Sequence, residues 1–117
     1  MRLSRAFAAA LVAILCGPFL IEAQAPRQII VVAKKFDFTP SKIELKVGEP
    51  VEITFQSEDT KHGFECKELK LEKVVFDKET PATVRFTPEK AGTFAFKCAK
   101  NCGLGHSGMK GEFVVSE

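Results

Sequence analysis

The chain of 117 residues contains no tryptophan and no tyrosine, and it has only two histidines and two methionines. The formal net charge of +2 is too small to indicate a nucleic-acid partner. Acidic and basic residues alternate along the chain instead of forming blocks, which is typical of a solvated surface. The chain has no internal repeat and no low-complexity tract. Its length predicts a single domain that can bury one modest core.

Sustained helical periodicity is also missing, and alternation of apolar and polar residues takes its place. Ile43, Leu45 and Val47 fall on one face of the segment 41–47, with charged residues on the other face. Further segments with this period are 51–56, 82–87 and 93–98. Residues 29–38 are expected to form the first strand and residues 111–115 the last. A period of two indicates half-buried strands. Short strands between turn residues, with a phenylalanine-rich interior, predict an all-β sandwich.

The first 25 residues have the pattern of an export signal. A basic start is followed by the apolar run 6–15, and Ala23-Gln24-Ala25 fits a small-x-small cleavage site. We therefore expect a signal peptide over residues 1–25 and a mature domain over residues 26–117. The domain is then exported, to the periplasm or to the outer face of the cytoplasmic membrane.

The alternative is an uncleaved membrane anchor, which is the one case in which we expect membrane contact. The uncharged run 6–21 would give a helix of about 24 Å, shorter than a hydrocarbon core of about 30 Å. Gly17-Pro18 would also interrupt that helix. Both observations favour the cleaved signal.

Three cysteines remain after the predicted cleavage, namely Cys66, Cys98 and Cys102. An odd number in an exported domain argues against a pure disulfide framework. Cys66 alternates with His62 and Phe64, so we expect it to be a thiol of the core.

Metal-binding side chains are concentrated in two short segments. Two thiols, an imidazole and a thioether occur within twelve residues, at Cys98, Cys102, His106 and Met109. The second histidine, His62, lies in the other segment, three residues after Asp59. Soft sulfur combined with imidazole suits copper far better than calcium, magnesium or manganese. Asp59 is either a turn residue or a partner that orients the His62 ring.

These residues converge on one end of the predicted sandwich. Cys98 ends the penultimate strand and Met109 precedes the last one. The loop between them contains Gly103, Gly105 and Gly108, and glycine permits the tight turns that a loop around a metal requires. His62 follows the strand 51–56 and can approach the same end, so rigid strands would hold the ligands on loops.

The two segments resemble the copper-A domain of subunit II of the heme-copper cytochrome c oxidases, which nitrous oxide reductase shares. That family has the loop pattern Cys-x3-Cys-x3-His-x2-Met and an upstream Asp-x-x-His, matched here by Cys98, Cys102, His106, Met109, Asp59 and His62. The resemblance covers nearly all of residues 29–116. It implies a cupredoxin-like Greek-key β-sandwich over residues 26–117.

The resemblance also implies a ligand set for two copper ions per chain. Cys98 and Cys102 would bridge the ions, and His62 and His106 would each bind one of them. Met109 would be a weak axial ligand. The backbone carbonyl that the family uses two residues after its first cysteine falls at Lys100.

The implied function is electron transfer, with a cytochrome or an oxidase catalytic subunit as redox partner. The ligand set leaves no evident open position, so we expect the chain to be an electron-entry subunit and not a catalyst by itself. It departs from oxidase subunits in having at most a marginal membrane segment, and from mitochondrial-type subunits in having Phe36 and Phe38 in the neighbourhood of their tryptophan.

Several alternatives remain open at the level of sequence. The same ligands could serve a copper storage or delivery protein, or a mononuclear cupredoxin. Cys98 and Cys102 could form a disulfide. Two cysteines and two histidines could also hold a structural zinc ion.

Overall fold

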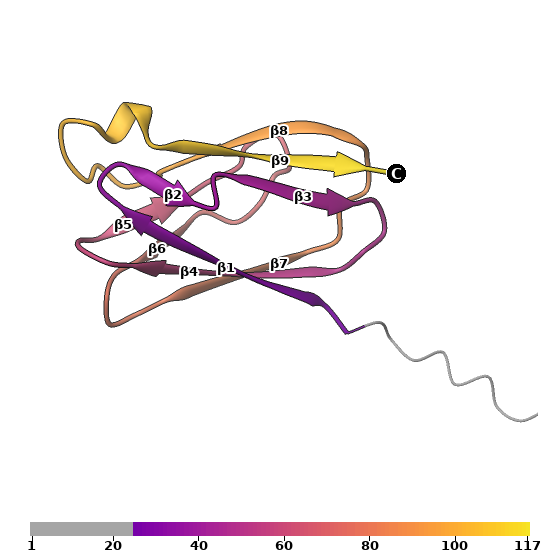
Figure 1. The fold of residues 1–117 in the computed structure, drawn as a ribbon, viewed down its shortest axis with the longest axis horizontal. Helices are drawn as coiled ribbons and strands as arrows, with labels where there is room; N and C mark the ends of the chain where they lie inside the picture. The colour runs from indigo at the N-terminus through magenta and orange to yellow at the C-terminus, as the bar shows by residue number, and fades with distance from the viewer. Residues whose placement is uncertain (1–24) are drawn as a thin grey trace, which may run out of the picture.

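The computed structural model describes residues 25–117, so the predicted signal peptide lies outside the described residues except for Ala25. The strands are β1 (Arg27–Lys34), β2 (Asp37–Thr39), β3 (Lys42–Lys46), β4 (Val51–Ser57), β5 (His62–Phe64), β6 (Val74–Phe76), β7 (Ala82–Phe86), β8 (Gly92–Lys97) and β9 (Lys110–Ser116). One sheet has the order β2-β1-β4-β7 and the other β3-β9-β8, while β5 pairs with β6 (Figure 1). The predicted all-β sandwich is confirmed.

The strands form where the apolar side chains recur at every second position. In β4, Val51, Ile53 and Phe55 are buried, and in β8 Phe94 and Phe96 are buried while their neighbours are exposed. This period places one face of each strand in the core.

Phenylalanine rings join the two large sheets across the core. Phe38 of β2 lies 5.3 Å from Phe96 of β8 between ring centroids, and Phe86 of β7 lies 5.6 Å from Phe113 of β9. Both pairs meet edge to face, an arrangement that aromatic quadrupoles favour. The interior therefore packs without any tryptophan or tyrosine.

The strand directions gather several chain ends at one pole of the sandwich. β1 runs parallel to β4, so both end at the same side, and β9 begins where β8 ends because Lys97 pairs with Lys110. Figure 1 shows the loop between β8 and β9 at the same end as the β1–β2 connection and β5, with the C-terminus at the opposite end. We call this end the loop pole.

Two expectations about strand boundaries are wrong. Residues 29–38 form two antiparallel strands instead of one, with Ala33 paired to Phe38 and a turn at Lys35 and Phe36. No glycine or proline marks this turn, so the sequence gives no local signal for it. Val47 is 37% exposed because β3 ends at Lys46 and the chain reverses at Gly48, whose φ is +81°.

The short pair of β5 and β6 was only partly predictable. Residues 62–66 show the expected parity, with His62, Phe64 and Cys66 all buried. β6 has only three residues, too few to establish a period. Within residues 25–117, no helix has the length and apolar character needed to cross a membrane.

Candidate metal centre

Four soft or imidazole donors lie buried together at the loop pole. His62 begins β5, Cys98 follows β8 directly, Cys102 lies in the next loop and Met109 precedes β9. The ligand atoms of His62, Cys98 and Cys102 all lie within 4.8 Å of one another. The Cys102 Sγ lies 3.8 Å from the Cys98 Sγ and 3.7 Å from the Met109 Sδ.

The approach of β5 to the end of β8 brings the two ligand segments together. Glu65 and Lys97 exchange two backbone hydrogen bonds of 3.0 Å. A Cβ added at Gly63 would lie 2.9 Å from the Lys100 nitrogen and 3.0 Å from the Ala99 Cβ, so only glycine fits there. The Gly63 N–H also donates to the Cys98 Sγ at 3.5 Å.

His62 has one ring nitrogen with a partner and one without. Its Nε2 lies 2.7 Å from Asp59 Oδ1, and its Nδ1 is buried with no hydrogen-bond partner. An unsatisfied buried polar atom is costly, and a metal ion among the facing sulfurs would satisfy it. A carboxylate on the other nitrogen is the usual means of orienting a histidine ligand. The residues present therefore fit a soft metal ion.

Asp59 is more than a turn residue. Partial burial by itself would raise the pKa of its carboxyl group, but three hydrogen bonds outweigh that effect. The donors are the backbone N–H of Lys35, the His62 ring and the backbone N–H of Thr60, and they lower the pKa to about 2. Asp59 is therefore ionised at neutral pH and holds the His62 ring in place.

The three described cysteines are free thiols. The 3.8 Å between the sulfurs of Cys98 and Cys102 is far from the roughly 2.05 Å of a disulfide. Burial raises the pKa of Cys102 to about 11, and the neighbouring Cys98 adds to the effect. Without a metal this thiol is protonated at neutral pH, so a bound cation must displace its proton.

Cys66 lies in the core as expected. Its side chain is 1% exposed, and burial raises the pKa of its thiol. It does not belong to the group formed by His62, Cys98 and Cys102.

The remaining two predicted site residues border the sulfurs. The Cys98 thiol donates to the Lys100 carbonyl at 3.0 Å. The Nδ1 of His106, which lies in the 3-10 turn η1 (His106–Gly108), is 3.8 Å from the Cys102 Sγ. The structure thus brings all six predicted residues to the loop pole. Sequence reasoning missed Gly63, because a glycine between His62 and Phe64 reveals nothing about the distant backbone against which it packs.

A two-sheet sandwich with buried cysteine, histidine and methionine at one end defines a small metal-binding β protein. The family of cupredoxin-like domains matches residues 6–115. The chain is also 34% identical over 108 residues to cytochrome c oxidase subunit 2 of Thermus thermophilus, covering 86% of this chain and 79% of that protein. It spans 64% of a second cytochrome c oxidase subunit 2 from the same species, at the same identity.

Solved structures share the fold. The periplasmic domain of subunit II of cytochrome oxidase from Bradyrhizobium japonicum superposes with a TM-score of 0.71 at 16% identity, over 80% of this chain and 86% of that one. The Cu(I)-bound metal-binding domain of the Cu(I)-exporting P-type ATPase of Streptococcus pneumoniae D39 gives 0.60 at 28% identity, over 77% and 85%.

The chain belongs to the cupredoxin family and is related to subunit II of cytochrome c oxidase. The predicted cupredoxin-like Greek-key fold is confirmed. The copper ligand set contains His62, Cys98, Cys102 and Met109.

Replacing Asp59 by asparagine should destabilise the reduced, metal-free protein by about 1–2 kcal/mol at pH 7, discounted for partial exposure. The folded-state pKa of Asp59 is lowered from 3.8 to about 2. Its stabilisation is therefore complete above pH 4 and is lost as the pH falls toward 2. Thermal unfolding of both proteins between pH 2 and 7 measures this, with Glu58→Gln as control. A difference that stayed constant over this range would contradict the assignment.

Serine at either Cys98 or Cys102 should greatly lower copper binding, because a hydroxyl is a poor, hard replacement for a thiolate. Cys66→Ala is the matched control, since it removes an equally buried thiol outside the ligand set. It should cost roughly 1 kcal/mol of stability and leave the copper spectrum unchanged. Metal analysis and visible absorption of the three variants test this. Loss of copper from Cys66→Ala would show that the ligand set is misassigned.

Proposed function

We propose that this chain is an exported electron-transfer protein with a dinuclear copper-A centre, similar to subunit II of cytochrome c oxidase. The observation that carries the proposal is the pair of buried, free sulfurs of Cys98 and Cys102, 3.8 Å apart, with a histidine beside them from each ligand segment. One metal ion with four ligands needs fewer donors than this cluster offers.

In this proposal each residue has a defined role. The thiolates of Cys98 and Cys102 would hold both ions, and His62 and His106 would bind one ion each. Met109 would be a weak ligand of one ion, and the Lys100 carbonyl would be a ligand of the other. When bound, copper supplies one-electron redox chemistry. The protein buries the sulfurs, and Asp59 orients the His62 ring.

The proposed partner is the catalytic subunit of an oxidase, with a cytochrome as electron donor. The relation to a protein named as an oxidase subunit supports this partner. The exposed apex of the ligand loop supports it too, because the side chain of Leu104 is fully exposed two residues before His106, and His106 itself is only partly buried. A redox partner could therefore approach the ligands at this apex. A periplasmic location is proposed from the sequence pattern of residues 1–25.

The dinuclear centre predicts two copper ions per chain in the oxidised protein. The unpaired electron should be shared, so electron spin resonance should show more hyperfine lines than one copper nucleus produces, and the protein should be purple. Metal analysis with the same spectra tests both points. One copper per chain with a single-nucleus spectrum would indicate a mononuclear cupredoxin, and zinc alone in the natively exported protein would indicate a structural site.

A second candidate function is copper storage or delivery with the same ligands. The similarity to the metal-binding domain of a Cu(I)-exporting ATPase, at 28% identity, favours it as the alternative. An electron carrier should retain its copper against a mild chelator and cycle reversibly between oxidation states. Chelator challenge followed by cyclic voltammetry distinguishes the two, because a delivery protein should release its copper within the same incubation.

A further inference from the structure

The β1–β2 turn lies between the two segments that carry the ligands. The backbone N–H of Lys35 donates to Asp59 Oδ2 at 2.7 Å, and the other oxygen of that carboxylate bonds the His62 ring at 2.7 Å. Two short hydrogen bonds therefore connect the backbone of the turn to the His62 side of the site.

The next residue of the turn, Phe36, contacts the other ligand segment. A Cβ added at Gly105 would lie 2.5 Å from the Phe36 Cγ, and one added at Gly103 would lie 3.2 Å from two atoms of the ring. The ring therefore packs directly on the backbone between Cys102 and His106. A Cβ at Gly108, in the same loop, would meet nothing within 4 Å.

The backbone hydrogen bonds donated inside the ligand loop do not attach it to the sandwich. The backbone hydrogen bonds donated by Gly103, His106 and Gly108 end on Asn101, Gly103 and Gly105, all within the loop itself. The Phe36 ring is part of the sandwich, since it is partly buried and packs against the core. Its contact with the two glycines therefore joins the part of the loop after the buried Cys102 to the rest of the fold.

We propose that Phe36 is a positioning residue for the copper site, and that the β1–β2 turn clamps the Cys102–His106 segment against the His62 segment. Lys35 and Asp59 secure one side of the site and the Phe36 ring the other. The inference rests on copper binding at this site, as the proposed function does, but it does not depend on whether one or two ions are bound.

The test compares copper release from the loaded protein for Phe36→Ala, Phe36→Leu and Phe36→Tyr. Release to a Cu(I) chelator is followed under reducing conditions, together with the visible spectrum. Phe36→Ala should accelerate release about 10–100-fold, the range for loss of outer-shell support at a metal site. Phe36→Tyr keeps the flat ring and should behave as the wild type, while Phe36→Leu should fall between them.

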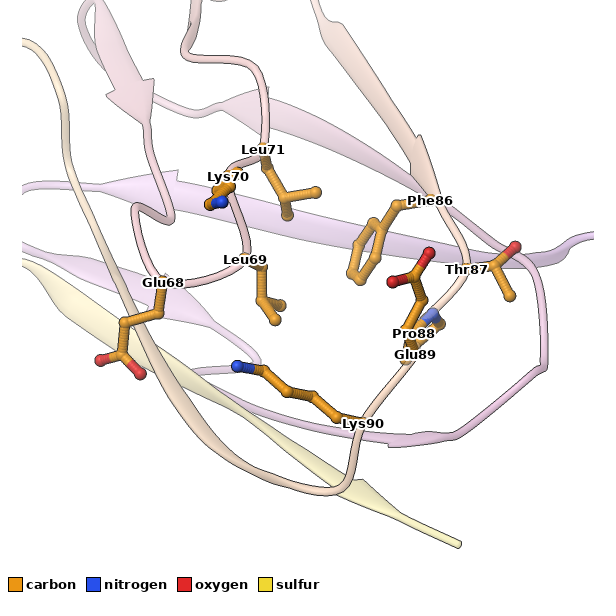
Figure 2. A pocket seen from close by; sticks show the side chains of 9 residues that line it. All are labelled: Glu68, Leu69, Lys70, Leu71, Phe86, Thr87, Pro88, Glu89 and Lys90. Atoms are coloured by element: carbon orange, nitrogen blue, oxygen red, sulfur yellow. The ribbon is translucent and has the colours of Figure 1, made fainter.

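Phe86→Ala is the matched control for the loss of a partly buried phenylalanine. Phe86 also packs against the core, but it lines a pocket of about 650 Å³ with Leu69 and Leu71. In Figure 2 its ring points toward these leucines. Because Gly48 donates to the carbonyl of Pro88 in this pocket, the pocket lies at the β3–β4 turn, away from the loop pole. Phe86→Ala should lower the melting temperature without changing copper release.

Hydrogen exchange in the copper-free protein gives a readout that needs no metal. Amides of residues 101–108 should exchange faster in Phe36→Ala and at the wild-type rate in Phe86→Ala. Equal exchange in all three proteins would overturn the clamp. If Phe36→Ala fails to fold, Phe36→Leu and the glycine variants below decide the question.

Gly105→Ala and Gly108→Ala form a second matched pair within the loop. The first adds a methyl group against the ring and should accelerate copper release, whereas the second adds it in open space and should not. Combining Gly105→Ala with Phe36→Ala gives that methyl group room, so the double variant should resemble Phe36→Ala alone.

Two results of the release measurements would also overturn the proposal: wild-type release from Phe36→Ala, or equal behaviour of the two glycine variants. A single-copper spectrum of the wild type would instead refute the dinuclear function, and the release measurements would still decide the role of Phe36.

Discussion

The site depends on how closely β5 can lie against the chain that leaves β8. Two backbone hydrogen bonds between Glu65 and Lys97 set the spacing of the two segments. A side chain at position 63 would clash with Ala99 and Lys100 at this spacing, and glycine avoids the clash. This contact buries His62 and places the Gly63 N–H at hydrogen-bond distance from the Cys98 sulfur. It also brings together two segments that are far apart in the sequence. The sandwich provides rigid strand ends, and this contact brings the ligands at those ends together in one binding site.

The burial that assembles the site also determines its acid–base state. Removing the Cys102 thiol from water favours its neutral form, whereas Asp59, with three hydrogen-bond donors, keeps its charge. The Cys102 thiol without metal is therefore neutral, and it lies beside a histidine that a carboxylate orients. This thiol becomes anionic only as a metal binds, so metal binding releases its proton.

Much of this could be predicted from the sequence, because the ligand spacing and the period-two pattern are local signals. These local signals predicted the ligands, and they predicted the strands that contain Val51 to Phe55 and Phe94 to Phe96. What was missed depends on backbone reversals and on neighbours distant in the chain. The turn at Phe36 has no glycine or proline, Val47 keeps the pattern of a strand that has already ended, and Gly63 acquires its meaning only from Ala99 and Lys100.

His62 and Cys98 are distant in sequence, yet they belong to one ligand set that also includes Met109 at the start of the last strand. A metal ion there acts as a reversible cross-link that closes a long stretch of chain. Any ligand that binds only the folded form raises stability with its concentration, by about 4 kcal/mol at a thousand times its dissociation constant. The free energy of unfolding would thus depend on how much metal the surroundings offer, so metal supply and the folded fraction of the protein would be thermodynamically linked.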